Sequence, residues 1–277
     1  MTPRVTKTVL ACACALAVLA ACGQRGASEN TGMKPEEAAA APVTGASAQA
    51  NAQRMASYAL ALAPLVAGSY GGSCMTMQGP APKEGVTVSS GGVASAPGFS
   101  RNLASVDDSL VVSRTASGGV TDSAAVLATS NAPKWTLGIN NGPQQSAMFG
   151  DGEAMTTCQQ VPQLGLMKAK GIYPALARFF TEGATTLPCV VELASTRDIA
   201  VSAAADGVTI DGKRIGLDRA MKKESATLDA GARLLSYNAE FEDGTLLNMS
   251  VDDSGKIVDM ASSSQGKVAY MCRKAQA

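Results

Sequence analysis

The sequence contains no histidine among its 277 residues. That absence excludes Ser-His-Asp and Cys-His nucleophile systems and histidine-ligated zinc, and it removes the usual general base near neutral pH. It argues against an enzyme without excluding one. Aromatic residues are also few, with five Phe, five Tyr and one Trp. A folded core must therefore be built mainly from Val, Leu, Ile and Met.

No charge of one sign dominates, because 23 Lys and Arg balance 23 Asp and Glu. Nucleic acids and anionic lipid surfaces are bound through a concentrated positive field, so a nucleic-acid partner is not expected. The Walker loop, the Gly-x-Gly-x-x-Gly loop and the Gly-x-Ser-x-Gly elbow are also missing. We therefore expect no cofactor and no metal site.

The N-terminus has the parts of an export signal. Arg4 and Lys7 precede an apolar run over residues 8–19, which is too short to span a bilayer as a helix and ends in small residues. The ending Leu-Ala-Ala-Cys at Cys22 resembles the lipobox of bacterial lipoproteins. That resemblance implies cleavage before Cys22, diacylation of its thiol and acylation of its new amino group. Residues 1–21 are then a signal peptide, and cleavage removes it together with Cys12 and Cys14.

The residue after Cys22 is Gly23 rather than Asp. By the same resemblance, this favours delivery to the outer membrane of a Gram-negative cell, with the folded part facing the periplasm. Residues 22–54 are rich in Ala, Gly, Ser, Glu, Pro and Gln and cannot bury enough apolar surface to offset their ordering entropy. We expect them to form a flexible tether, in which a helix over residues 48–58 would be marginal alone.

Beyond the tether, the chain shows signs of an internal repeat. Three residues of the first half recur 115 positions later. The pairs are Tyr58 and Tyr173, Gly68 and Gly183, and Cys74 and Cys189. The next cysteines follow after similar intervals, 84 residues in the first half and 83 in the second. The spacing predicts a tandem duplication, with a first module over residues 55–162 and a second over residues 163–277.

Each module reads as a short helix followed by short β-prone runs that are separated by Asp- and Gly-rich turns. In the second module the predicted strands cover residues 190–193, 199–203, 207–210, 214–217, 233–241, 245–251, 256–260 and 267–272. In the first they cover residues 85–89, 109–114, 124–128, 134–139, 145–149 and 154–159, with Asn140-Asn141-Gly142 as the best hairpin turn. For residues 218–232 the sequence does not decide between a helix and a long loop. The predicted fold class is mainly β with short helices, as two tandem antiparallel β modules.

Four cysteines remain besides the lipidated one, and their spacing matches no metal finger or redox motif. An oxidising periplasm favours disulfides over free thiols. Of the three connectivities, the repeat selects Cys74–Cys158 and Cys189–Cys272, so that each bond closes one module. Closing loops of this length contributes about 4.5 kcal/mol in the chain-entropy model.

Other candidate groups are weak. Ser264 and Lys267 have the spacing of the nucleophile and base of penicillin-interacting enzymes, but they lie in a Ser-rich turn without the companion motifs. The acids near residues 240–259 lack the alternating pattern of a calcium loop and are interpreted as solvated hairpin tips. Trp135 is the only tryptophan. The sequence does not decide whether it occupies a core position or is exposed as a contact for a sugar or protein partner.

The sequence therefore favours a lipid-anchored envelope protein, without catalytic residues, that holds a protein or polysaccharide near the membrane. One alternative is an inhibitor of a wall-degrading enzyme, because the predicted disulfide-closed β modules loosely resemble periplasmic lysozyme inhibitors in architecture, though not in sequence motifs. The other alternative is an envelope hydrolase that uses carboxylates or a serine, since paired carboxylates meet in space and not in sequence.

Overall fold

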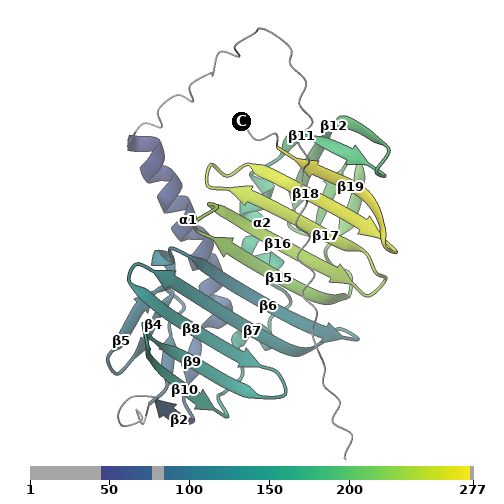
Figure 1. The fold of residues 1–277 in the computed structure, drawn as a ribbon. Coiled ribbons are helices and arrows are strands. Elements are labelled where there is room, and N and C mark those ends of the chain that lie inside the picture. Colours follow the sequence, from purple (N-terminus) through teal and green to yellow (C-terminus); the bar gives the residue numbers. More distant parts are fainter. Residues whose placement is uncertain (1–44, 77–83, 275–277) are drawn as a thin grey trace, which may run out of the picture. The chain divides into compact units, whose positions relative to one another are not determined.

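The computed structural model describes residues 45–76 and 84–274, all of which belong to one compact unit (Figure 1). In this part of the chain the protein is mainly antiparallel β, with two α-helices, two short 3-10 turns and nineteen strands. The helices are α1 (Gly45–Val66) and α2 (Tyr173–Thr181), and the turns are η1 (Leu103–Ser105) and η2 (Gly165–Met167). The predicted mainly β fold class is confirmed.

Fifteen strands form one sheet, in which every neighbouring pair is antiparallel. In spatial order they are β14 (Lys213–Gly216), β13 (Gly207–Ile210), β12 (Ser195–Ala204), β11 (Thr185–Val191), β19 (Lys267–Arg273), β18 (Ile257–Ser264), β17 (Leu246–Asp252), β16 (Leu234–Phe241), β15 (Met221–Asp229), β6 (Ser109–Ser117), β7 (Val120–Asn131), β8 (Lys134–Asn141), β9 (Gln145–Asp151), β10 (Ala154–Gln159) and β2 (Ser73–Thr76). A second, small sheet contains β1 (Gly68–Tyr70), β3 (Val86–Val88), β4 (Val93–Ala96) and β5 (Phe99–Asn102).

The strands form because apolar residues alternate with polar ones along most of them. In β16, Leu235, Tyr237, Ala239 and Phe241 are buried, whereas the residues between them are only partly covered. Side chains two apart share one face of a strand, so one side of the large sheet carries the core. Tight turns at Asp211-Gly212 and Gln265-Gly266, all with positive φ, close two of the hairpins.

Both helices and the small sheet pack on that side of the large sheet, which we call the inner face; the other side is the open face. Figure 1 shows α1 and α2 behind the large sheet. Tyr58 of α1 packs edge-on against Phe179 of α2 with ring centroids 4.7 Å apart, and Tyr173 of α2 lies 5.2 Å from Tyr237 of β16. Phe99 of the small sheet packs 5.6 Å from Phe149 of β9. The inner face is thus covered by elements from both halves of the chain.

One register of directly opposed residues crosses twelve strands and has a disulfide bond at each end. In order across the sheet, the residues are Cys74, Cys158, Ala147, Ile139, Val126, Val112, Ala226, Tyr237, Met249, Met260, Cys272 and Cys189. The bonds are Cys74–Cys158 and Cys189–Cys272, which is the predicted connectivity. At the centre of the row, β6 pairs directly with β15. The two predicted modules therefore share one continuous sheet.

Several predicted boundaries are wrong. Helix α1 begins at Gly45, inside the predicted tether, because residues from Tyr58 onward bury one helical face and stabilise the turns before it. The open segment 218–232 contains strand β15, and β4 and β5 were not predicted because they are short and rich in small or polar residues. The signal peptide, Cys22 and the rest of the tether up to residue 44 lie outside the described residues.

Two buried tyrosines in this core predict a loss of stability in alkali. Burial raises the pKa of both Tyr58 and Tyr70 to about 12. A folded-state pKa above the unfolded value of 10.0 stabilises the fold below pH 10, and this stabilisation is lost as the pH rises towards 12. Urea unfolding followed by circular dichroism should show that loss, and Tyr70→Phe should make the decline between pH 10 and 12 shallower. An unchanged pH slope in Tyr70→Phe would contradict the assignment.

Candidate functional site

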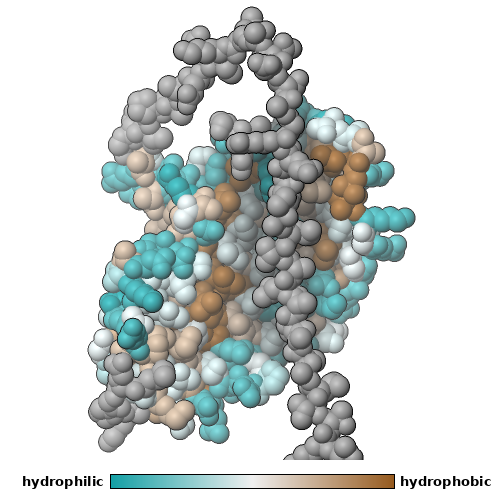
Figure 2. All heavy atoms as spheres, viewed as in Figure 1, coloured by the Kyte–Doolittle hydropathy of each residue, from teal (hydrophilic) through white to brown (hydrophobic). Residues whose placement is uncertain are grey.

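The open face carries a groove with a volume of about 730 Å³. Its lining comes from seven neighbouring strands, β19, β18, β17, β16, β15, β6 and β7, with three residues from each. The groove therefore runs across the strands and over the β6–β15 junction, so that both halves of the chain contribute to it. Figure 2 shows this face of the sheet, with apolar residues in brown.

Small side chains form the middle of the groove floor. One row of opposed residues there runs through Ala125, Ser113, Ser225, Asn238, Asn248, Ala261 and Met271. The two amides bond each other, since Asn248 Nδ2 donates to Asn238 Oδ1 at 2.6 Å. Leu246 and Met271 stand out from the floor with 47% and 50% of their surface exposed.

Aliphatic side chains continue across the open face beyond the groove. Met75, Leu127 and Met148 lie on one row that crosses β2, β10, β9, β8 and β7, and all three are exposed. Together with Leu246 and Met271, they make up five of the nine exposed large hydrophobic residues in the described ranges. Exposed apolar side chains gathered on one face, rather than scattered singly, typically mark a binding surface.

Two charged side chains, Lys223 and Glu240, lie on the open face in the groove, and they pair with each other. Arg114 and Glu224 also belong to the lining residues, but their side chains lie on the inner side of the sheet and pair there. Glu240 also accepts a 2.8 Å hydrogen bond from the Lys222 ammonium, which lowers the pKa of the carboxyl and is matched by a raised pKa of Lys222. The groove itself presents one positive and one negative side chain, Lys223 and Glu240, whose charges sum to zero.

The protein exposes no aromatic ring on this face. All eleven Phe, Tyr and Trp residues fall within the described ranges, and all are buried. Trp135 is only 2% exposed because it lies on the inner face of β8, with its ring centroid 6.4 Å from that of Phe99. The suggested partner contact through Trp135 is therefore wrong, and the core alternative is correct.

A buried ion pair lies at the β6–β15 junction, on the inner side of the sheet. Arg114 and Glu224 are opposite each other in the strand register, and Arg114 Nε donates to Glu224 Oε2 at 2.8 Å. The guanidinium also donates to the carbonyl oxygens of Ala169 and Lys170, at 3.1 and 3.0 Å. The other carboxylate oxygen of Glu224 accepts bonds from the Tyr173 N–H and the Tyr237 hydroxyl, both at 2.8 Å.

This cluster ties the two halves of the chain together. Helix α2 has no side-chain cap of its own, and Glu224 takes that role for its first N–H group, where a negative charge is favourable. Burial, followed by the neighbouring Glu224 carboxylate, raises the pKa of Tyr237 well above its ordinary value. Because each charged group has two or more partners, the cluster fits a structural role better than a catalytic one.

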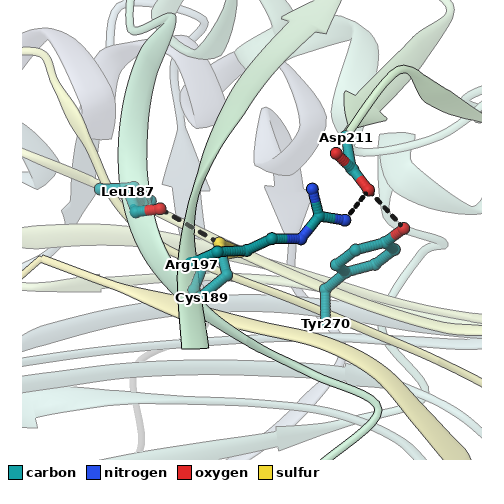
Figure 3. The surroundings of a disulfide bond; sticks show 6 residues. Leu187, Cys189, Arg197, Asp211 and Tyr270 are labelled. Atoms are coloured by element: carbon teal, nitrogen blue, oxygen red, sulfur yellow. Dashed lines mark hydrogen bonds and ion pairs between the residues drawn. A yellow bond between two sulfur atoms is a disulfide. The ribbon is translucent and has the colours of Figure 1, made fainter. Parts of the chain in front are cut away.

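The disulfide bonds also fit a structural role. Three of the four cysteines are fully buried, and Cys74 is partly covered. Figure 3 shows Cys189 beside Leu187, with Arg197, Asp211 and Tyr270 nearby. In that group, one Asp211 oxygen lies 2.5 Å from the Arg197 guanidinium and accepts a bond from the Tyr270 hydroxyl at 3.3 Å.

The remaining sequence candidates do not come together. Ser264 and Lys267 face each other across a two-residue hairpin and not along a helix. The carboxylates of Asp243 and Asp252 bind backbone N–H groups of their own turns, while Glu240 and Asp259 pair with neighbouring cations. In residues 45–76 and 84–274 no group of three His, Cys, Asp or Glu side chains could hold a metal ion. The helices in these same ranges are too short or too polar to span a bilayer.

Neither the groove nor the ion pair was predicted from the sequence. A signal for the ion pair is the alternation in residues 223–228, where Glu224 shares a strand face with Ala226 and Leu228 and therefore has to be buried with a partner. The groove has no such local signal. A scan of the chain against protein-family models, a search of curated proteins and a search of solved structures found no match, so the candidate site rests on its own geometry.

Proposed function

We propose that the mature protein is a lipid-anchored envelope protein with a non-catalytic binding role, and that the groove on the open face is its binding surface. The observation that supports this most is the gathering of exposed aliphatic side chains on that face, two of them in the groove, in a protein that buries every aromatic ring. An unpartnered apolar face of this kind is unfavourable in water unless a ligand covers it for part of the time.

The proposed anchor is Cys22, acylated at the outer membrane with the folded part in the periplasm. Residues 23–44 separate Cys22 from helix α1. Twenty-two residues span at most about 75 Å when fully extended. An anchor at Cys22 would therefore keep the start of helix α1 within that distance of the membrane, so that the folded part stays near the envelope components.

We also propose that the fold arose by tandem duplication. Three observations support it: the equal spacing of the cysteines, a helix before each half's first disulfide strand, and the matching order of β6–β10 and β15–β19 on either side of the central junction. In this view each half is one β module closed by its own disulfide, and the modules are joined antiparallel through β6 and β15.

The hydrolase alternative gains no support from the groove. Two of its lining residues are acidic, but the Glu224 carboxylate lies on the inner side of the sheet, and the Glu240 carboxylate is held in ion pairs. A retaining or inverting glycosidase needs one carboxylic acid and one free carboxylate facing a shared substrate. No observation favours an inhibitor of wall-degrading enzymes over a general binding role.

Site-specific crosslinking in native envelopes tests the proposed function. A photoreactive amino acid at Met271, in the groove, should give a discrete adduct, whereas the same residue at Leu193, an exposed hairpin position outside the groove, should not. Cys22→Ser should move the protein from the membrane fraction to the soluble periplasmic fraction and reduce the adduct. Equal labelling from Met271 and Leu193, or no adduct from either, would contradict the binding role.

A further inference from the structure

We infer that the groove binds an acyl chain of a membrane phospholipid. This inference rests on the proposed binding role and names the chemistry of the ligand. It is carried by three hydrogen-bonded pairs of polar side chains on the open face, by the neutral lining of the groove, and by a length that accommodates the chain.

Polar side chains on the open face bond to each other across neighbouring strands. Beyond the amide pair of Asn238 and Asn248, the hydroxyls of Thr115 and Ser123 lie 2.7 Å apart, and those of Ser236 and Ser250 lie 2.8 Å apart. Such pairs use up hydrogen-bonding capacity within the sheet. The surface that remains for a ligand is largely the carbon of Ala, Leu, Val and Met side chains.

This surface discriminates between ligand classes. A sugar chain is typically bound through exposed aromatic rings and free polar groups, whereas Tyr270, the one aromatic residue in the lining, is only 5% exposed. A charged peptide needs unpaired charges of opposite sign, but the two charged side chains on the open face of the groove, Lys223 and Glu240, pair with each other. An uncharged aliphatic chain complements a neutral lining, and flexible Met and Leu side chains can adjust to it.

The groove is also long enough to hold an acyl chain. The lining crosses seven strands, and thus six inter-strand spacings of about 4.8 Å, or ~29 Å in all. An acyl chain occupies half of a hydrocarbon core that is about 30 Å thick, or ~15 Å. The groove is about twice as long, so one phospholipid chain can lie along part of it with its headgroup outside. The acyl chains on Cys22 are the less suitable source, because withdrawing one from the bilayer would weaken the anchor.

The test uses the full mature chain with Cys22→Ser, so that it carries no acyl chains of its own. Vesicles of phosphatidylethanolamine and phosphatidylglycerol would contain a phospholipid with a photoactivatable acyl chain. After illumination, mass spectrometry should find the label on β17 and β19. Leu246→Asp and Met271→Asp should each reduce the labelling at least tenfold, because an exposed carboxylate would have to be desolvated against the chain. Leu193→Asp, the matched control, should leave it unchanged.

Met271→Leu should retain the labelling, and circular dichroism of every variant shows whether it is folded. Labelling spread over the surface, or labelling that both groove Asp variants retain, would overturn the inference. If the crosslinker at Met271 captures a protein in native envelopes and vesicles give no label, the acyl inference fails while the proposed function stands. Labelling of the Cys22→Ser chain but not of the acylated wild-type chain would assign the groove to the protein's own anchor instead.

Discussion

Replacing Glu224 by leucine should lower the free energy of unfolding by about 3–5 kcal/mol, because it leaves a buried cation without its partner. The side chain of Glu224 is 1% exposed and that of Arg114 is 10% exposed. In Glu224→Leu the guanidinium keeps its carbonyl acceptors but loses its counter-charge. The Tyr173 N–H and the Tyr237 hydroxyl lose their acceptor at the same time.

Denaturant unfolding of Glu224→Leu and of Arg114→Leu/Glu224→Leu tests this reasoning. The double variant should recover part of the lost stability, because it removes the unpaired buried charge, although the two tyrosine donors and the Ala169 and Lys170 carbonyls then lose their partners. A leucine pair already occurs four residues along the same strand pair and on the same face, where Leu110 of β6 lies opposite Leu228 of β15 and both are buried.

Lys222→Gln serves as the matched control, since it breaks an exposed pair with Glu240 and should leave the unfolding midpoint unchanged. If Glu224→Leu unfolds at the same midpoint as the wild type, the cluster does not hold the halves together.

Much of the fold could be predicted because its strands follow local rules. The strand over Gly207–Ile210 was predicted with the correct bounds, since a clear alternation and an Asp-Gly turn define it. The disulfide pairing followed from the repeated cysteine spacing. Helix α2 was also indicated by its apolar stretch, although its start at Tyr173 depends on an acceptor from distant β15.

The site could not be predicted, because it depends on which strands become neighbours. Nothing in the local pattern of β6 or β15 specifies that they pair, yet this junction creates both the groove and the contact of Arg114 with Glu224. The position of Trp135 was open for a related reason. Alternation places Trp135, Leu137 and Ile139 on one face of β8, but only the packing of the small sheet shows that this face is covered.

Removing the second disulfide should cost about 4.5 kcal/mol in the chain-entropy model, for a loop of 83 residues. Because both cysteines are buried, Cys189→Ala with Cys272→Ala is the suitable variant. The loss should extend to the whole described unit and not only to its second half. The reasons are the continuous β6–β15 pairing and the contact of Tyr58 in α1 with Phe179 in α2.

Two probes can follow the halves separately in this variant. Trp135 is the only tryptophan and lies in β8 of the first half, so its fluorescence reports that half, whereas far-ultraviolet circular dichroism reports the strands of both. A shared sheet predicts that the two signals change at one denaturant concentration, lower than in the wild type. The double variant Cys74→Ala with Cys158→Ala opens a loop of 84 residues and should likewise lower the midpoints of both signals together. If Trp135 fluorescence keeps its wild-type midpoint while the dichroism signal falls earlier, the halves unfold independently, and the central junction contributes little to stability.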